Sequence, residues 1–424
     1  MLFIEHILLQ LELLSYVFIH MKIKNSILAK GTALLCLFLI SSCNYISNVH
    51  LLSRGSVEQN NFLESIDFEN RHGILVVKGT VNDHSDTLEF IFDTGAFDNK
   101  ITQNWADNYE LKERATKDKP DSQGNSNEIS MTLINKISLG NIDFKNTAAG
   151  IIEYPENSLS PCIAADGIIG ANLIREANWK IDYVNNKIWI TDDFSKFKEL
   201  NTKTTPPIKF KKPTLSGTPK IDLTVNGKEL GNILFDTGSN GSVDLPVSIK
   251  DQIFINSNAE WDTTLDNSSS GIWGTNFDSV FTSQSGTQFK GYDVLESEIN
   301  FADKGFAKVG NDVLEKYDVY LNYDKKRIYL KKNTNYDAVH TKSSFGFIPY
   351  YNAENIWTVE NLVLGSPAHK SDINFGETIT KIDGKTPDQF YSSFCGYFDW
   401  VTNYFVDKET VTVEIDGRLI TVKK

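Results

Sequence analysis

The chain contains Ile91-Phe92-Asp93-Thr94-Gly95-Ala96 and, further on, Ile233-Leu234-Phe235-Asp236-Thr237-Gly238-Ser239. Each stretch runs from apolar residues typical of a buried strand into Asp-Thr-Gly, which are ordinary turn residues. Each therefore predicts a strand that presents its Asp at the strand end, followed by a Gly that lets another backbone approach closely. A single copy would favour a structural turn. Two copies in one chain favour a duplicated site.

The sequence downstream of each Asp repeats as well. Gly167-Ile168-Ile169-Gly170 follows the first, and Lys308-Val309-Gly310 follows the second. The two aspartates lie 143 positions apart and the two closing glycines 140 positions apart. Nearly constant offsets indicate an internal duplication. We expect a short helix after each closing glycine and, because the other apolar runs are short and β-branched or aromatic, a mainly β body.

These motifs resemble those of the pepsin and retropepsin superfamily of aspartic proteases, over roughly residues 73–332. The resemblance implies two retropepsin-like β-barrel lobes related by pseudo-two-fold symmetry, with Asp93 and Asp236 as the catalytic pair. It further implies that two Thr hydroxyls cross-brace the loops and that two Gly residues leave room for them: Thr94, Gly95, Thr237 and Gly238. The second half departs from the family pattern at Lys308, where an apolar residue is usual, so its loop crossing is expected to be looser.

Two adjacent carboxylates cannot both ionise cheaply, so the pair shares one proton and titrates as a unit. The ionised member can then take a proton from a water molecule while the protonated member donates to a peptide carbonyl. The sequence thus predicts an aspartic endopeptidase that hydrolyses extended polypeptides. Ser239 either helps keep its neighbouring carboxylate ionised or reflects surface variation, and the sequence does not assign the base. The alternative is a catalytically silent, peptide-binding or scaffolding lipoprotein of the cell envelope.

A flap over the cleft is expected at Gly271-Ile272-Trp273-Gly274, because Gly residues on both sides of an apolar pair suit a mobile hairpin tip. The corresponding interval of the first half, residues 122–127, is polar and less informative. An ordinary Gly-containing hairpin loop is the alternative.

Composition excludes several other classes of function. The net charge of −13 argues against nucleic acid as a partner. The seven His residues form no motif with zinc-ligand spacing, so we expect no metal and no cofactor. Of the four Cys residues, Cys162 and Cys395 fall in what look like separate domains, so we expect no disulfide framework.

The N-terminal region has the pattern of a secretory signal. From Met21 onward, a lysine-containing segment precedes an apolar run and then Ser41-Ser42-Cys43. Small residues before a Cys resemble a bacterial lipobox, which implies lipid attachment at Cys43 and a place in the cell envelope, facing the periplasm or the surface. An uncleaved anchor helix is the alternative, although the apolar run is short for a bilayer span. The first 20 residues fit neither a signal nor a span, so the true start is expected at Met21.

The last 80 residues resemble a PDZ domain. Phe345-Gly346-Phe347, then Gly365-Ser366-Pro367-Ala368 and Ile382-Asp383-Gly384 follow in the order and spacing of that family. PDZ domains add an extended peptide as a strand, and the resemblance implies that the loop Phe345-Gly346-Phe347 captures a terminal carboxylate. A small structural cap without a ligand is the alternative.

The predicted organisation runs from a signal peptide through a tether, two lobes with a linker between them, and the PDZ domain. The expected bounds are 1–43 for the signal, 44–70 for the tether, 71–200 for the first lobe, 201–219 for the linker, 220–332 for the second lobe and 343–424 for the PDZ domain.

Overall fold

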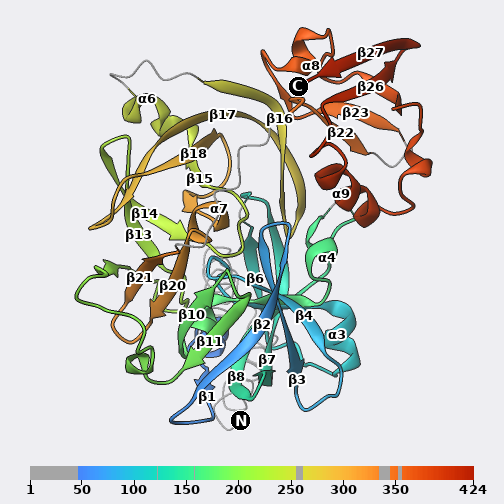
Figure 1. Cartoon of the computed structure of the whole chain (residues 1–424). Helices are drawn as coiled ribbons and strands as arrows, with labels where there is room; N and C mark the ends of the chain where they lie inside the picture. The colour runs from blue at the N-terminus through green and yellow to red at the C-terminus, as the bar shows by residue number, and fades with distance from the viewer. Residues whose placement is uncertain (1–45, 122, 157, 255–260, 334–343, 352–355) are drawn as a thin grey trace, which may run out of the picture. The chain divides into compact units, whose positions relative to one another are not determined.

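The computed structural model describes residues 46–121, 123–156, 158–254, 261–333, 344–351 and 356–424. The chain divides into two units, residues 1–50 and residues 51–424. The second unit is mainly β, as the sequence predicts (Figure 1). Over the described ranges, no helix combines the length and hydrophobicity needed to cross a membrane. The predicted signal peptide and Cys43 lie outside the described residues.

Three sheets make up the described part of the second unit. The 14-stranded sheet contains β1 (Ser56–Val57), β2 (Leu63–Arg71), β3 (Ile74–Val81), β4 (Leu88–Phe92), β5 (Asn99–Thr102), β6 (Ala115–Pro120), β7 (Ser126–Leu139), β8 (Ile142–Ile152), β9 (Gly167–Ile169), β10 (Asn178–Asp182), β11 (Lys187–Thr191), β12 (Ile208–Lys209), β20 (Tyr317–Asn322) and β21 (Arg327–Lys332). The eight-stranded sheet contains β13 (Lys220–Val225), β14 (Lys228–Phe235), β15 (Val243–Pro246), β16 (Asp262–Gly271), β17 (Gly274–Phe289), β18 (Leu295–Ala302), β19 (Lys308–Val309) and β24 (Leu362–Val363). The five-stranded sheet contains β22 (Ile348–Tyr351), β23 (Trp357–Glu360), β25 (Thr378–Ile382), β26 (Thr410–Ile415) and β27 (Arg418–Lys423).

The helices of the second unit are short. The α-helices are α3 (Gln103–Asn108), α4 (Ser160–Ile163), α5 (Ala171–Ile174), α6 (Lys250–Ile253), α7 (Asn311–Leu314), α8 (Pro367–Lys370) and α9 (Phe394–Asn403). Single 3₁₀ turns are η1 (Phe194–Lys196), η2 (Val247–Ile249) and η3 (Pro387–Gln389). The helices expected after the two closing glycines are α5 and α7, so that prediction is confirmed.

Both halves use the same strand pairings around the Asp-Thr-Gly turns. In the first half, β4 runs parallel to β9, and β9 pairs antiparallel with β5. In the second half, β14 runs parallel to β19, and β19 pairs antiparallel with β15. The registers correspond, because Ile91 faces Ile168 in one pairing and Leu234 faces Lys308 in the other. Lys308 therefore occupies the regular register position, and the looser crossing expected there is not seen.

The two halves share a sheet and a core. Strand β10 of the first half pairs antiparallel with β20 of the second, and one apolar cluster extends from Phe62 to Leu330. The sheets also include parts of the predicted tether and linker. The last part of the predicted tether belongs to β2, which pairs with β3 and β11. The expected linker 201–219 contains β12, which pairs with β21. Neither segment shows an apolar periodicity in the sequence, but both contain strands whose backbones pair with strands far away in the chain.

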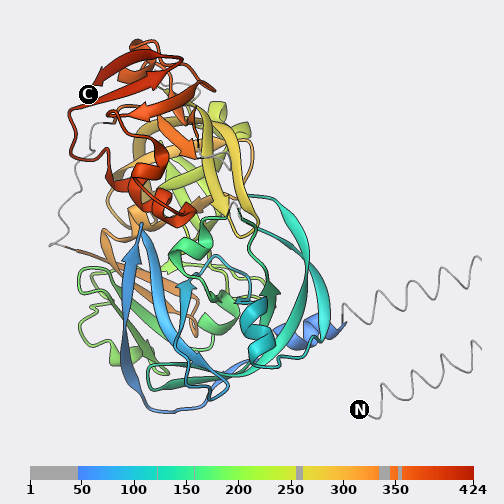
Figure 2. The same ribbon diagram turned by 90° about the vertical axis from the view of Figure 1, so that its right-hand side faces the viewer.

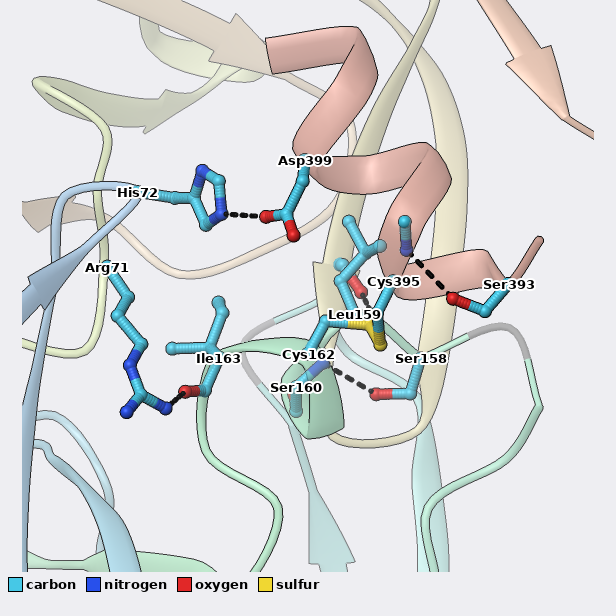
Figure 3. The surroundings of a disulfide bond; sticks show 12 residues. Arg71, His72, Ser158, Leu159, Ser160, Cys162, Ile163, Ser393, Cys395 and Asp399 are labelled. Atoms are coloured by element: carbon cyan, nitrogen blue, oxygen red, sulfur yellow. Dashed lines mark hydrogen bonds and ion pairs between the residues drawn. A yellow bond between two sulfur atoms is a disulfide. The ribbon is translucent and has the colours of Figure 1, made fainter. Parts of the chain in front are cut away.

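The C-terminal module, residues 344–424, has its own core around the buried Trp357. The module lies beside β16 and β17 of the eight-stranded sheet (Figures 1 and 2). Its strand β24 pairs with β16 at the edge of that sheet. A disulfide also links Cys162 of α4 to Cys395 of α9 (Figure 3). The prediction that these cysteines would not pair is therefore wrong. They are 233 positions apart, and nothing local in the sequence indicates that α9 packs beside α4.

Candidate active site

The structure brings Asp93 and Asp236 together at the ends of β4 and β14. The amide of Asp93 donates to the Ile169 carbonyl at 3.0 Å, and the amide of Asp236 donates to the Val309 carbonyl, also at 3.0 Å. The parallel partner strand thus fixes each backbone in the same way. The two carboxyl groups are within hydrogen-bonding contact of each other.

The threonines of the two turns hold the loops together by four reciprocal hydrogen bonds. The Thr94 amide donates to Thr237 Oγ1 at 3.0 Å, and the Thr237 amide donates to Thr94 Oγ1 at 3.1 Å. Each hydroxyl in turn donates to a carbonyl of the opposite strand, Thr94 to Phe235 at 2.6 Å and Thr237 to Phe92 at 2.8 Å. Both threonines are fully buried, so every one of these groups would be costly to leave unpaired.

Each glycine of the two turns packs against the carboxyl group of the other half. A Cβ on Gly95 would overlap the Asp236 carboxyl, and a Cβ on Gly238 would overlap the Asp93 carboxyl. The close approach of the two side chains therefore requires glycine at both positions. This is the physical reason for the third residue of the repeated Asp-Thr-Gly pattern.

The charge environment of the two carboxyl groups is unequal. Asp93 Oδ1 accepts from the amides of Gly95 at 2.7 Å and Ala96 at 2.9 Å, whereas Asp236 Oδ1 accepts from the Gly238 amide at 3.0 Å. Burial and then the charge of Asp93 raise the pKa of Asp236 well above its ordinary value. One ionised and one protonated carboxyl group is the arrangement that can activate a water molecule and protonate a carbonyl.

Lys308 lies beside this pair in the second half. Its ammonium is buried and forms an ion pair with Asp244 at 3.5 Å. Burial alone would lower the pKa of Lys308, but the charges of Asp244 and then Asp236 outweigh burial and raise it. Lys308 in turn opposes the rise of the Asp236 pKa. The residue that departs from the family pattern is thus an electrostatic part of the site.

Ser239 and Asn311 support the second loop. The Ser239 carbonyl accepts from the Asn311 amide at 2.8 Å, and Ser239 Oγ lies against Gly310. Asn311 Nδ2 donates to the carbonyls of Thr237 at 2.8 Å and Gly73 at 2.7 Å. The sequence analysis missed Asn311. The sequence feature that could have identified Asn311 is its position as an amide side chain directly after the closing glycine, at the start of a buried helix.

The predicted flap is a β-hairpin formed by β16 and β17, with Ile272 and Trp273 at its tip. Gly271 pairs with Gly274 and closes the hairpin. Ile272 packs against an apolar cluster that also contacts Ala96. Trp273 packs against a second cluster, which Phe97 also contacts. The tip therefore reaches the segment that directly follows Asp93-Thr94-Gly95.

The tip rests on the hairpin formed by β6 and β7 of the first half. Trp273 Nε1 donates to the Lys119 carbonyl at 2.8 Å, and the Trp273 amide donates to Asp121 Oδ2 at 3.3 Å. Ser269 Oγ donates to Gln123 Oε1 at 2.9 Å. Ser122, at the start of the polar interval, lies outside the described residues, but the rest of that interval forms the end of this hairpin. Both intervals at which a flap was considered are thus hairpins, and they contact each other.

Behind the first loop lies a buried charge cluster that the sequence analysis missed. Asp98 Oδ1 accepts from Lys100 Nζ at 2.7 Å and from Lys119 Nζ at 2.6 Å. Burial would raise the pKa of Asp98, but the charges of Lys100 and then Lys119 lower it. Burial lowers the pKa of Lys100 to about 7. Asp98 directly precedes β5 and Lys100 lies in it, so two opposite charges next to a buried strand could be recognised in the sequence. Lys119 comes from the β6–β7 hairpin, far away in the sequence.

The C-terminal loop Phe345-Gly346-Phe347 is a tight turn at the edge of the module. Gly346 has φ +84°, both phenylalanines are buried, and the Gly346 amide donates to Ser344 Oγ at 3.0 Å. The neighbouring edge strand β22 contacts α9, where the ring centroids of Tyr351 and Tyr397 lie 5.7 Å apart. One amide of this loop is therefore already used.

The module also contacts the flap and its surroundings. Leu364 donates its amide to the Thr263 carbonyl at 2.8 Å, next to the pairing of β24 with β16, and Tyr350 meets Phe277 of β17 at a centroid distance of 5.1 Å. His72 Nε2 lies 3.0 Å from Asp399 Oδ1 of α9 (Figure 3). Among the described residues, no group of three or more His, Cys, Asp or Glu side chains could hold a metal ion.

Comparison with known proteins gives a family match and similar solved structures. Residues 77–173 match the family model described as aspartyl protease. The chain is similar to the solved structure of a retropepsin-like aspartic protease from Rickettsia conorii, with 18% identity over 32% of this chain and 92% of that chain, at a TM-score of 0.24. No protein of the curated set matches the chain. The family match includes Asp93-Thr94-Gly95 and β9, and it supports an aspartyl protease.

Proposed function

We propose that the protein is an aspartic endopeptidase that hydrolyses peptide bonds of extended polypeptides with water activated between Asp93 and Asp236. The observation that carries the proposal is the reciprocal bracing of the two turns by Thr94 and Thr237, with each glycine packed on the opposite carboxyl group. An arrangement of this kind holds two carboxyl groups in contact despite the electrostatic cost of burying them together.

In the proposed reaction, the ionised carboxylate takes a proton from the bound water while the protonated carboxyl donates to the scissile carbonyl. The product of this step is a tetrahedral intermediate that is not covalently bound to the enzyme. The raised pKa favours the protonated form of Asp236, which is therefore the proposed proton donor. Closure of the β16–β17 hairpin would hold the substrate in an extended conformation and exclude other water molecules.

The test is cleavage of a diverse peptide mixture by the full-length chain, read by mass spectrometry. We expect the wild type to cut and the variants Asp93→Asn and Asp236→Asn each to lose at least about a hundredfold in rate, because the acid–base pair is lost. Asp67→Asn is the matched control, since Asp67 is an exposed carboxylate in the same half. If the folded wild type cleaves no peptide from pH 4 to 8, the result would favour the alternative function, a catalytically silent, peptide-binding lipoprotein.

The C-terminal module is proposed to be a PDZ-type domain that binds the end of a peptide or partner chain beside β22. Support comes from its five-stranded sheet, in which β22 is an edge strand, and from the position of α9 next to that edge. A peptide that adds to β22 would lie beside the packed rings of Tyr351 and Tyr397.

The module proposal is tested with matched peptides that end in a free carboxylate or in a carboxamide. We expect the full-length protein to bind the carboxylate form more tightly. Equal affinity for the two peptide forms would show that the loop does not capture a carboxylate.

The protein is further proposed to be a lipid-anchored protein of the bacterial cell envelope, with lipid on Cys43. The support is the signal-like pattern before Ser41-Ser42-Cys43. Mass spectrometry of the mature N-terminus tests the proposal, because a lipid-modified Cys43 is expected as the first residue. An unmodified N-terminus upstream of Cys43 would favour the uncleaved anchor.

A further inference from the structure

One strand of the β6–β7 hairpin presents a row of lysines to the segment that follows the first Asp-Thr-Gly turn. Lys117 and Lys119 lie two positions apart in β6, so their side chains share one face of the strand. Both ammonium groups lie over the ring of Phe97, Lys117 at 4.1 Å and Lys119 at 4.9 Å from its centroid. Phe97 is the fourth residue after Asp93. The lysines therefore border the loop that carries one of the two candidate catalytic carboxyl groups.

The positive charge in this row exceeds the negative charge around it. Asp98 is the carboxylate that binds Lys100 and Lys119, and its side chain is fully buried. Its Oδ2 atom is buried and, within the described part of the chain, has no hydrogen-bond partner, so Lys117 does not reach it. Lys117 is half-buried and forms no ion pair with any carboxylate of the described residues. Burial lowers its pKa, as expected for a cation with too little compensation.

The row lies between the catalytic loop and the tip of the flap. Trp273 at the tip donates from Nε1 to the Lys119 carbonyl, and Trp273 and Phe97 pack against the same apolar cluster. A polypeptide bound under the flap and over the two aspartates would pass this position, and its side chains would alternate between its two faces. One of them would point toward the ammonium groups.

The second half lacks the same features. At the positions that correspond to Phe97 and Asp98 it has Asn240 and Gly241, and at the position of Lys100 it has Val243. The first half therefore has an aromatic ring, a buried carboxylate and a lysine at positions where the second half has Asn240, Gly241 and Val243. A charge on one side only can set the direction and register of a bound chain.

We propose that Lys117, together with Lys119, forms a subsite that binds an acidic side chain of the substrate close to the scissile bond. The proposal rests on the proposed endopeptidase function and adds the substrate class: polypeptides with Asp or Glu at one fixed position relative to the cut. The carboxylate would compensate the excess positive charge beside Phe97, and Asp98 would keep Lys119 in place.

The test uses a set of peptides that differ at a single position, scanned along the sequence around a mapped cut site, with Glu, Gln or Lys at that position. For the wild-type full-length protein we expect kcat/KM at one position to favour Glu over Gln by about tenfold, the usual order for a charge-assisted hydrogen bond. Lys117→Met should bring this ratio close to one, and Lys117→Glu should favour the Lys peptide. Lys112→Glu is the control, because Lys112 is an exposed lysine shortly before β6.

Binding of the same peptides to the Asp93→Asn protein, read by fluorescence anisotropy, gives the ratio independently of cleavage. Equal binding and equal cleavage of the Glu and Gln peptides at every position would overturn the subsite, as would a ratio that Lys117→Met leaves unchanged. A protein that prefers Glu peptides in binding but cuts none would instead overturn the proposed protease function. Circular dichroism checks the fold of each variant, and Lys117→Met retains the side-chain length if Lys117→Glu fails to fold.

Discussion

The first and second halves of the molecule have the same backbone frame around their Asp-Thr-Gly turns but different buried charges. Their strand pairings agree in direction and register, and each turn is followed by a strand, a glycine and a short helix. In the first half, Asp98 is a fully buried carboxylate that binds two lysines. In the second half, Gly241 occupies the position that corresponds to Asp98, and Lys308 lies next to the pair of aspartates.

This difference shows how a repeated frame can give two unequal acids. Hydrogen bonds between main chains and threonines fix the geometry, and they are the same in both halves. The charged side chains around this shared backbone geometry determine which protonation state each carboxyl group prefers. Asp98 is held in its ionised form by its partners, whereas burial and Asp93 favour the protonated form of Asp236.

The largest expected effect is on stability, from Asp98→Asn. This variant leaves the buried ammonium groups of Lys100 and Lys119 without their carboxylate, which should lower the free energy of unfolding by about 3–5 kcal/mol at pH 7. The pKa of Asp98 is depressed in the folded state, so its stabilisation is present above its unfolded value of 3.8 and is lost as the pH falls below it. Urea unfolding of wild type and variant from pH 7 to pH 3 measures this, with the exposed Asp118→Asn as control. A difference that stays constant over this range would contradict the assigned cause.

Asp236→Asn should change stability in the opposite direction. The pKa of Asp236 is raised in the folded state, so wild-type stability falls as the pH rises from 3.8 through that raised value. An amide does not titrate, and the variant should be more stable at pH 7 by about 0.5–2 kcal/mol, the usual range when an unfavourable functional group is removed. The gain should disappear below pH 3.8, where both states carry a protonated carboxyl. Thermal unfolding at several pH values measures it, and a loss of stability at pH 7 would contradict the assignment.

The sequence contains enough local information to predict the strands and helices around the two Asp-Thr-Gly turns, but not the charged groups that surround them. Asp93, Asp236 and the closing glycines lie in short repeated stretches, so their strands and helices could be predicted from turn chemistry and apolar runs. The pairing of β10 with β20, the addition of β24 to β16 and the Cys162–Cys395 disulfide join segments far apart in sequence. No local pattern specifies such contacts, because they depend on how complete sheets pack. For the same reason, Asp98 could be read as a partner of Lys100 but not of Lys119.

The smallest expected effect, and the most direct test of unequal charges, comes from Lys308→Met. Lys308 favours the ionised form of Asp236, so its removal should raise the pKa of Asp236 further. Because the two aspartates titrate as a pair, both limbs of the bell-shaped pH dependence of kcat/KM should move to higher pH. The Asp244 carboxylate that loses its partner is one-third exposed and keeps a bond from Asn300 Nδ2 at 3.3 Å, so the fold should tolerate the change.

Ile168→Met is the matched control for Lys308→Met, because Ile168 occupies the same register position opposite β4 as Lys308 does opposite β14. It changes an apolar side chain without removing a charge and should leave the pH dependence in place. Lys308→Arg keeps the charge and should move the profile less than Lys308→Met does. If Ile168→Met and Lys308→Met shift the profile equally, packing at this strand position, and not the lysine charge, sets the titration of the pair. The two halves would then be electrostatically equivalent at the site, and their difference would be confined to the cluster around Asp98.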